Sequence, residues 1–412
     1  MFFAGLYDSW YLYRQIQTFM QISETTIQFI EAHLQDDVRT LALQAQKYPE
    51  VDIDMAVTQI SGRQVAKAKV PSWYATEGLW YPKHLSMEQC SSEATALYKA
   101  TLIKGETLTD LTGGFGIDCC FLSRQFHQTN YVERQSELCE LAEHNFPLLG
   151  LNIKVHNQDG TDYLQQMNPV DCIYLDPARR DGHGGKTVAI SDCEPDVQAL
   201  EDLLLKKAQI VMVKLSPMLD LSLAIHSLKS VSAVHVVSVN NECKELLLIL
   251  NAKKTDKLEI HTVNILQVEE DQQFTFTLEQ EQDCYCLFAS APEVYLYEPN
   301  ASILKAGAYK ILTHSYPIRK LHRNSHLYTS TEWIPSFPGR KFKIEAISGF
   351  GKKELKSFMQ SIEKANLTIR NFPSSVAELR KRLKLKEGGE VYVFATTLAD
   401  EQKVLIKCSK VQ

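Results

Sequence analysis

The chain has 412 residues, 44% of them hydrophobic, which is enough for two to four compact units that each bury a core. Its formal net charge of −6 excludes a uniformly basic nucleic-acid binder. Ten cysteines are too sparse for a disulfide scaffold, and no apolar run approaches the ~18 residues of a membrane span, so we expect a cytoplasmic protein with reduced thiols.

Charge is segregated along the chain. Residues 1–299 hold 23 Lys and Arg against 41 Asp and Glu, a balance of −18, whereas residues 300–412 hold 21 against 9, a balance of +12. A basic module attached to an acidic one is typical of a catalytic core with a nucleic-acid-docking part. A basic face that packs against the acidic part of the same chain would give the same counts, so charge alone leaves both interpretations open.

Residues 1–88 are predicted to form a helical N-terminal cap and an irregular segment. The aromatic start of the chain is interrupted by Asp8 and has no basic segment before it, so we expect neither secretion nor membrane insertion. Apolar residues recur at helical spacing over residues 22–45. Residues 46–90 contain several prolines and aromatic side chains, which favours an irregular segment that lies over a core.

Residues 89–270 are predicted to form an α/β core. Short apolar runs alternate there with helix-like stretches, which indicates a parallel sheet with crossover helices. Only residues 240–245 separate the last two strands, and so short a connection forces an antiparallel pair at the edge of the sheet. Five parallel strands closed by one hairpin is not the usual dinucleotide-binding layout. The expected strands cover residues 107–111, 129–133, 153–156, 172–176, 209–214, 233–239 and 246–250.

Two smaller units are predicted after this core. Residues 271–335 are expected to form a small linking α+β domain, and residues 336–412 a small basic α+β domain of about the size of an RNA-docking module. Its basic residues are interleaved with aromatic ones, and these two residue types contact phosphates and stack on bases. In this last domain we expect strands from residue 342 and at 367–371, 390–396 and 403–408, with helices at 352–365 and 374–385.

A glycine-rich turn follows the first strand of the core. Its sequence, Asp110-Leu-Thr-Gly-Gly-Phe-Gly116, precedes an apolar helix, so the glycines fall where the chain turns tightly and a ligand can approach the backbone. No Gly-Lys-Ser/Thr follows, which excludes a phosphate-binding P-loop, and the regular spacing of nicotinamide enzymes is absent. The turn therefore indicates a site for a charged small molecule at a helix N-terminus.

Carboxylates end the next strands in order. Glu133 ends the second strand about twenty residues after the turn, where it can accept hydrogen bonds from both ribose hydroxyls of a nucleoside. Asp159, after the third strand, could accept a hydrogen bond from an adenine amino group. The fourth strand ends in Asp176-Pro-Ala-Arg179, which leaves a carboxylate and backbone carbonyls in the crevice where α/β sheets bind ligands.

These four features, in this order, resemble the core of class I S-adenosylmethionine-dependent methyltransferases. The Asp-Pro-Ala-Arg sequence at 176–179 is similar to the Asn/Asp-Pro-Pro-aromatic motif of amino-group methyltransferases and to the Asp-Pro-Pro-Arg of RNA uridine-C5 methyltransferases. The whole chain resembles bacterial methyltransferases that carry a C-terminal THUMP-like domain, and the catalytic turn resembles that of the cap-guanine-N2 group. The resemblance implies a Rossmann-like sheet and S-adenosyl-L-methionine as cofactor.

The resemblance also implies roles for single residues and for the last domain. THUMP domains of related enzymes dock structured RNA, so tRNA or rRNA is the expected partner. Gln89 and Ser91 to Glu93 would help to close the cofactor pocket, although Ser91 and Ser92 also suit a plain helix N-cap. The other implied residues are Asp110, Thr112, Gly113, Gly114, Gly116, Glu133 and Asp159 for the cofactor, and Asp176, Pro177, Ala178 and Arg179 for catalysis.

Three positions depart from the family pattern. Thr112 stands where many members have Gly, Ala178 where a second Pro is expected, and Arg179 where an aromatic ring would stack on the base. Stacking could come instead from the guanidinium of Arg179 or from the indole of Trp73 or Trp80.

Two chemical routes could lead to methyl transfer onto a base. The uridine-C5 route needs a cysteine nucleophile at the end of a later strand. Neither Lys214-Leu-Ser-Pro217 nor Ser238-Val-Asn240 contains one, and Cys243 lies further into the hairpin, which disfavours this route. Transfer to an exocyclic amino nitrogen needs in-line positioning and acceptors for the amino hydrogens, and Asp176 with the Pro177 carbonyl could be those acceptors.

The sequence therefore predicts methylation of a base in structured RNA, most simply at an amino nitrogen. Methylation of a protein or small molecule, and a non-catalytic RNA-binding protein built on the same fold, stay as alternatives. No metal is expected, because His322 with His326 on one helix face and Cys284 with Cys286 match no standard zinc spacing. The sequence indicates no oligomeric state.

Overall fold

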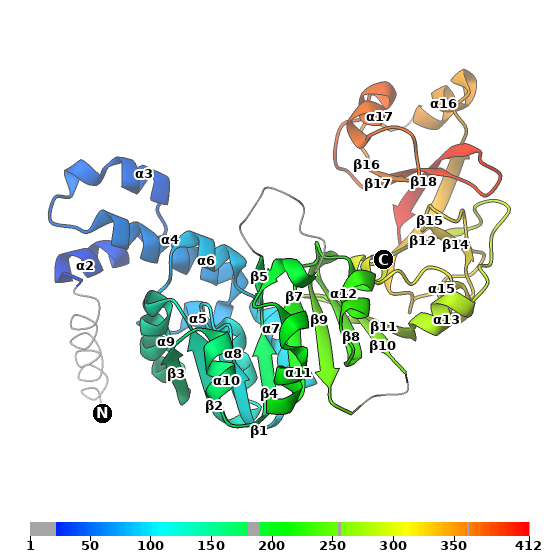
Figure 1. Ribbon diagram of the computed structural model, residues 1–412. Coiled ribbons are helices and arrows are strands. Elements are labelled where there is room, and N and C mark those ends of the chain that lie inside the picture. Colours follow the sequence, from blue (N-terminus) through cyan, green and yellow to red (C-terminus); the bar gives the residue numbers. More distant parts are fainter. Residues whose placement is uncertain (1–21, 180–189, 254–256, 361, 412) are drawn as a thin grey trace, which may run out of the picture. The chain divides into compact units, whose positions relative to one another are not determined.

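The computed structural model describes residues 22–179, 190–253, 257–360 and 362–411 (Figure 1). The chain divides into two compact units. One unit is formed within residues 1–214, 227–230 and 249–253, and the other within residues 215–226, 231–248 and 254–412. None of the described helices is long and apolar enough to cross a membrane.

Helices form the beginning of the first unit. The side chains of Ser23, Asp37 and Asp52 each accept a hydrogen bond from a backbone N–H in the first turn, and so start three of these helices. The irregular segment predicted for residues 46–90 is wrong in part, because a 17-residue helix, α4, occupies its centre. Its prolines flank that helix instead of interrupting it, and Pro71 begins the next one. The helices are α2 (Glu24–Ala32), α3 (Val38–Leu43), α4 (Ile53–Lys69), α5 (Pro71–Ala75), α6 (His84–Gln89) and α7 (Glu93–Leu102).

A nine-stranded sheet follows, in the order β11-β10-β8-β9-β7-β4-β1-β2-β3. The five strands β1, β2, β3, β4 and β7 pair in parallel, as predicted. The predicted hairpin joins β8 to β9 through Asn240 and Asn241, whose φ angles of 49° and 65° suit a tight two-residue turn. The strands are β1 (Gly105–Asp110), β2 (Phe126–Glu133), β3 (Ile153–Asn157), β4 (Val170–Leu175), β7 (Ala208–Leu215), β8 (Val231–Val239), β9 (Glu242–Asn251), β10 (Glu259–Ile265) and β11 (Gln272–Thr277).

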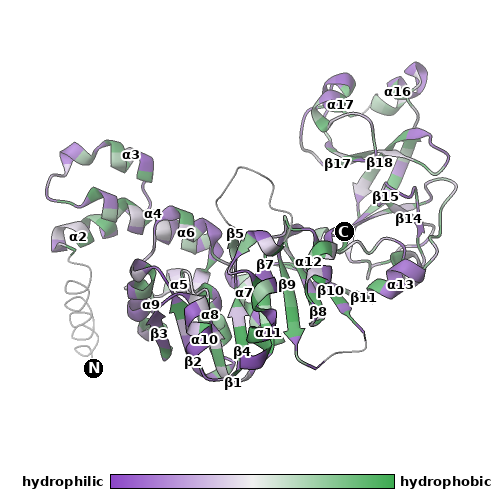
Figure 2. Cartoon of the chain, viewed as in Figure 1, coloured by the Kyte–Doolittle hydropathy of each residue, from purple (hydrophilic) through white to green (hydrophobic). Residues whose placement is uncertain are grey.

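The sheet does not close at this hairpin, which corrects the predicted layout. Strand β10 pairs with β8 in parallel, and β11 pairs with β10 in antiparallel orientation. Their side chains Ile260, Val263 and Phe276 are buried, so these strands continue the hydrophobic layer. The strands of the sheet are mostly hydrophobic in Figure 2, as expected for a sheet covered on its faces. The connecting helices are α8 (Ile117–Ser123), α9 (Ser136–Leu148), α10 (Gly160–Gln166), α11 (Val197–Lys207) and α12 (Leu221–Ser227).

The second unit also contains a seven-stranded sheet, in the order β13-β14-β12-β15-β18-β17-β16. The helix predicted at residues 352–365 ends at Met359, where α16 stops. His322 and His326 do not share a helix face, because the chain forms no helix there and His326 has a φ of 51°. The strands are β12 (Tyr295–Pro299), β13 (Arg319–Lys320), β14 (Tyr328–Ser330), β15 (Gly339–Ser348), β16 (Asn366–Arg370), β17 (Val391–Thr397) and β18 (Lys403–Lys410), and the helices are α13 (Leu278–Asp283), α14 (Ala301–Ala306), α15 (Leu312–Ser315), α16 (Lys352–Met359) and α17 (Val376–Leu383).

A buried carboxylate on β12 links this strand to β15 and β16 of the same sheet. Glu298 on β12 is 1% exposed and accepts a hydrogen bond from Arg340 Nε at 2.6 Å, while its other oxygen lies 2.7 Å from Arg370 Nη2. Arg340 is on β15 and Arg370 ends β16, so one side chain links three strands. Removing the Glu298 carboxylate would leave two guanidinium groups without their shared partner and would destabilise the fold.

Candidate active site

The glycine turn between β1 and α8 is shaped by contacts with β2. A Cβ atom on Gly113 would lie 2.2 Å from the ring of Tyr131, so only glycine fits against that ring. The Tyr131 hydroxyl in turn donates to the carbonyl of Gly114 at 2.5 Å. Gly114 and Gly116 adopt φ angles of 55° and 86°, which other residues rarely adopt. These contacts hold the turn at the carboxyl end of the sheet.

Glu133 and Asp159 lie beside this turn, as the strand order requires. The carboxylate of Glu133 accepts the N–H of Gly114 and that of Gln135, both at 2.9 Å. Asp159 begins helix α10, and its Oδ1 accepts the N–H groups of Thr161 and Asp162. The next residue, Gly160, packs directly under the turn, because a Cβ there would lie 2.2 Å from the carbonyl oxygen of Leu111.

Thr112 joins the glycine turn to the Asp-Pro turn after β4. Its N–H donates to Oδ1 of Asp110 at 3.0 Å, and its hydroxyl oxygen accepts the N–H of Asp176 at 2.6 Å. A glycine at this position could not make the second bond. Asp110 is 1% exposed, and burial raises the pKa of its carboxyl well above the usual range.

The Asp-Pro turn itself leaves Asp176 partly open to solvent. The Asp176 side chain is 38% exposed, whereas Pro177 is buried beneath it. Ala178 is exposed and pairs with Glu194 in the short ladder of β5 (Ala178–Arg179) with β6 (Cys193–Glu194). The backbone of Arg179 belongs to this ladder, but its side chain lies outside the described residues.

A buried cluster of charges lies behind Asp176. The ammonium of Lys214, at the end of β7, is 2.6 Å from Asp176 Oδ2 and 3.4 Å from Asp118 Oδ2. Asp118 lies in the first turn of α8 and is also paired with Lys99 at 3.1 Å. Its Oδ2 further accepts the hydroxyl groups of Ser91 and Tyr174, each at 2.7 Å.

The charges of this cluster are balanced, because two ammonium groups lie beside two carboxylates. Burial alone would raise the pKa of Asp118, but Lys99 and then Lys214 outweigh burial and hold that pKa below its usual value. Lys99 is fully buried and Lys214 is 11% exposed, so water screens these pairs little. Lys214 therefore connects the helix after the glycine turn with the carboxylate of the Asp-Pro turn.

The sequence alone did not identify this cluster. The sequence pattern predicts no role for Lys99 or Asp118, and it marks Lys214 only as part of a segment without a cysteine. A usable signal exists, since each is a charged residue within an otherwise apolar stretch that must be buried. Such a residue needs an opposite charge, but the sequence does not say which one.

The two serines before α7 make different contacts. Ser92 caps the helix by accepting the N–H of Thr95, as the plain N-cap interpretation expects. Glu93, in the first turn, also accepts the N–H of Ser72 at 2.8 Å. Ser91 reaches the charge cluster through Asp118. Gln89 is exposed at the end of α6, and its part in closing the cofactor pocket stays a prediction.

The proposed stacking by Trp73 or Trp80 is wrong. Trp73 is 1% exposed and packs edge-on against Phe115 with ring centroids 4.9 Å apart. Trp80 is 7% exposed, and its backbone is tied to the side chain of Asn145. Both indoles are part of the hydrophobic core, so neither presents a face to a base.

Neither a thiolate nucleophile nor a metal cluster is found among the described residues. Burial raises the pKa of Cys243 to about 11, which keeps this thiol neutral and disfavours it as the nucleophile of a C5 route. No group of three or more His, Cys, Asp or Glu in the described part of the chain is arranged to hold a metal ion.

One solved structure matches nearly the whole chain. It is a "putative methyltransferase" from Porphyromonas gingivalis W83, 36% identical, with a TM-score of 0.83 over 94% of this chain and 98% of that one. The chain belongs to this methyltransferase family. Family models match residues 295–338 as a ferredoxin-like domain and residues 339–410 as a THUMP domain-like region. The chain is thus a methyltransferase with a THUMP-like C-terminal domain.

More distant structures are similar only in part. A class I S-adenosylmethionine-dependent methyltransferase from Listeria monocytogenes is 12% identical, with a TM-score of 0.35 over 59% of this chain and 93% of that one. A 16S rRNA N2 methyltransferase from T. thermophilus is 16% identical, with a TM-score of 0.33 over 42% of this chain and 46% of that one. None of the curated proteins matches the methyltransferase.

Proposed function

We propose that this methyltransferase transfers a methyl group from S-adenosyl-L-methionine to an exocyclic amino nitrogen of a base in structured RNA. The observation that carries the proposal is the Asp-Pro turn. Asp176 keeps a partly exposed carboxylate in place through Thr112 on one side and Lys214 on the other. This is a fixed acceptor at the end of β4, next to the turn that would hold the cofactor.

The residues around the glycine turn suit the cofactor. Gly114 leaves open space where any other residue would place a Cβ, since only the Thr112 carbonyl lies within 4 Å, at 3.7 Å. We assign the ribose hydroxyls to Glu133, whose carboxylate oxygens can each accept a bond besides those from the backbone. We assign the adenine amino group to Oδ2 of Asp159, because the capping bonds use Oδ1. When bound, the cofactor supplies an electrophilic methyl group.

The chain's own part in the reaction is orientation and proton handling. Asp176 Oδ1 and the Pro177 carbonyl are the acceptors for the two amino hydrogens, which turns the nitrogen lone pair toward the methyl donor. Lys214 occupies Oδ2 and so leaves Oδ1 for the substrate. The nitrogen becomes acidic as it is methylated, and the Asp176 carboxylate is placed to accept its proton.

The C-terminal domain supports RNA as the substrate. Residues 300–412 carry a balance of +12, and the THUMP-like match covers 339–410. A positively charged module raises affinity for any RNA by releasing counterions, while the methyltransferase core would choose the base. We propose that the division at residues 88, 270 and 335 separates a helical cap, the core, a linking domain and this RNA-docking domain.

The test is methyl incorporation from labelled S-adenosylmethionine into total RNA from cells that lack the protein, followed by nucleoside analysis. Asp176→Ala is the variant, because it removes both the acceptor for the amino hydrogen and the charge that accepts the proton. We expect label in a methylated guanosine, adenosine or cytidine, and a loss of about 100-fold with Asp176→Ala. Cofactor affinity of the variant, measured by calorimetry, should stay close to that of the wild type.

Two outcomes would overturn the proposal. Label in protein or in small molecules, with none in RNA, would reassign the substrate. Cofactor binding without transfer to any of these fractions would make the protein an RNA-binding scaffold.

A further inference from the structure

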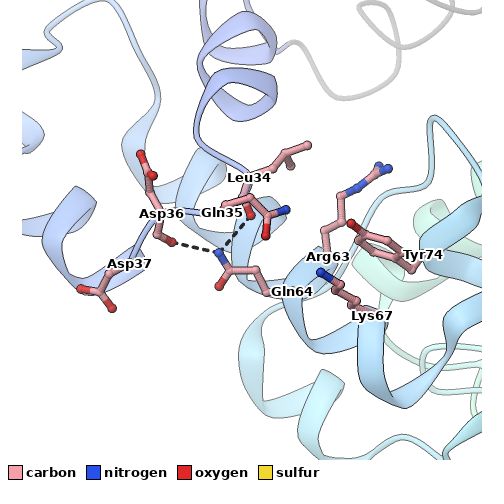
Figure 3. A pocket seen from close by; sticks show the side chains of 8 residues that line it. All are labelled: Leu34, Gln35, Asp36, Asp37, Arg63, Gln64, Lys67 and Tyr74. Carbon is pink, nitrogen blue, oxygen red and sulfur yellow. Dashed lines mark hydrogen bonds between the residues drawn. The ribbon is translucent and has the colours of Figure 1, made fainter.

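A hollow of about 390 Å³ lies among the N-terminal helices, within the first unit and apart from the candidate active site (Figure 3). One wall is the turn between α2 and α3, and the other is the second half of α4 with Tyr74 of α5. The side chain of Gln64 fixes this arrangement, because it donates to the carbonyls of Leu34 and Asp36 at 3.1 Å and 2.9 Å. The hollow is therefore built by the fold and is not a gap between loose side chains.

Two cations of α4 border an aromatic ring at this hollow. The guanidinium carbon of Arg63 is 5.2 Å from the centre of the Tyr74 ring, and the ammonium of Lys67 is 5.8 Å from it. The two residues are four apart on one helix and so lie on the same face. Figure 3 shows both side chains beside the ring, on the wall opposite Leu34.

The donors of these cations have no acceptor within the described part of the chain. Among the described residues, the side chains of Arg63, Lys67 and Tyr74 make no hydrogen bond or ion pair with another group. Nε of Arg63 is buried without an acceptor, which costs free energy unless a ligand supplies one. Most cations of α4 lie here even though residues 1–299 carry a balance of −18. Two neighbouring cations within this acidic part of the chain indicate a ligand with negative charge.

We infer that this hollow is a second RNA-contact site, which takes one nucleotide of the substrate strand. Arg63 and Lys67 contact its phosphate, and the base lies against the Tyr74 ring. On the opposite wall, Asp36 Oδ2 pairs with His33 and Asp37 Oδ2 accepts two hydrogen bonds from Thr40. These exposed carboxylates disfavour a second phosphate there, and their Oδ1 atoms can accept hydrogen bonds from base amino groups. This combination fits a nucleotide better than a simple anion, whose binding would gain nothing from the ring or the carboxylates.

The position of the hollow suits a strand that also reaches the active site. Tyr74 follows Trp73, and Trp73 packs edge-on against Phe115 of the glycine turn. The wall of the hollow and the turn that holds the cofactor thus belong to one continuous core. The inference rests on the proposed RNA substrate and adds a contact outside the THUMP-like domain.

The test is fluorescence anisotropy of the full-length protein with end-labelled bulk tRNA from cells that lack it, over a series of salt concentrations. The variants are Arg63→Gln with Lys67→Gln, Tyr74→Leu, and Lys104→Gln as an exposed cation outside the hollow. The double variant should lower the slope of log affinity against log salt by about 0.7, since both cations contact the same phosphate and one lost phosphate contact removes about 0.7 on a single strand. Tyr74→Leu should weaken binding about tenfold and leave the salt slope unchanged. Lys104→Gln should change neither quantity.

The outcomes separate this inference from the proposed function. If the wild type binds and methylates RNA but the hollow variants bind like Lys104→Gln, the second contact site is refuted and the proposed function stands. If the variants lose affinity for heparin and for RNA alike, with Tyr74→Leu unchanged, the hollow is only a patch for polyanions. If the wild type binds no RNA, both proposals fail. Cofactor affinity equal to that of the wild type shows that each variant is folded.

Discussion

Replacing Lys214 by Met tests how far catalysis depends on the buried charge cluster. Met has a similar length and is apolar, so the change removes the ammonium and little volume. Loss of one partner of a buried ion pair costs about 3–5 kcal/mol when the other charge is left alone. Here Asp118 keeps Lys99 at 3.1 Å, and Asp176 is 38% exposed, so water replaces part of the lost interaction. We therefore expect the free energy of unfolding to fall by about 2 kcal/mol.

The effect on methyl transfer should be larger than the effect on stability. Without Lys214, the Asp176 carboxylate loses the ammonium that lies 2.6 Å from Oδ2 and can rotate away from the amino group, while the Asp176 N–H still donates to Thr112. A misplacement of about 1 Å lowers a rate by roughly 100-fold, so we expect kcat to fall by that factor. KM for the cofactor should change little, because backbone N–H groups, and not Lys214, hold the carboxylates of Glu133 and Asp159 in place.

Urea unfolding and steady-state methyl transfer on the same preparations provide both quantities. Lys206→Met, an exposed change in the last turn of α11, serves as the control and should leave both near the wild-type values. A Lys214→Met enzyme with wild-type kcat would refute the positioning role of Lys214. A fall in kcat that is matched by an equal rise in KM for the cofactor would refute it as well, since the damage would then lie in cofactor binding.

Two further predictions concern the cofactor site and the sheet. Glu133→Gln should weaken cofactor binding about tenfold in calorimetry, because a neutral amide accepts weaker hydrogen bonds from the ribose than a carboxylate does; unchanged affinity would remove Glu133 from the site. Burial, and then His261, lower the pKa of His235 from 6.5 to about 3. The unfolded chain therefore binds a proton that the folded chain does not, and stability should fall as the pH drops from about 6.5 toward 3. His235→Phe should lose part of this dependence in urea unfolding, whereas a difference from the wild type that is equal at pH 7 and pH 4 would contradict it.

Local sequence determined the parts of the site that one strand and its following turn can build. The glycines of the first turn, Glu133, Asp159 and Asp176 each end a core strand, and parallel strands bring such ends to one edge. The hairpin between β8 and β9 could also be predicted, because a short connection permits only antiparallel pairing. The boundaries of the domains and the roles of the single site residues stay predictions.

Tertiary structure alone decided which distant groups meet. Lys99, Asp118 and Lys214 come from α7, α8 and β7, and nothing near them in the sequence names their partners. They meet because the sheet order β7-β4-β1 places the end of β7 two strands from the start of α8. Tertiary packing also buries Trp73 and Trp80. It likewise extends the sheet through β10 and β11. Sequence pattern fixes which face of an element is apolar, but burial of a charge or a ring depends on what packs against that face, and only the folded chain determines that.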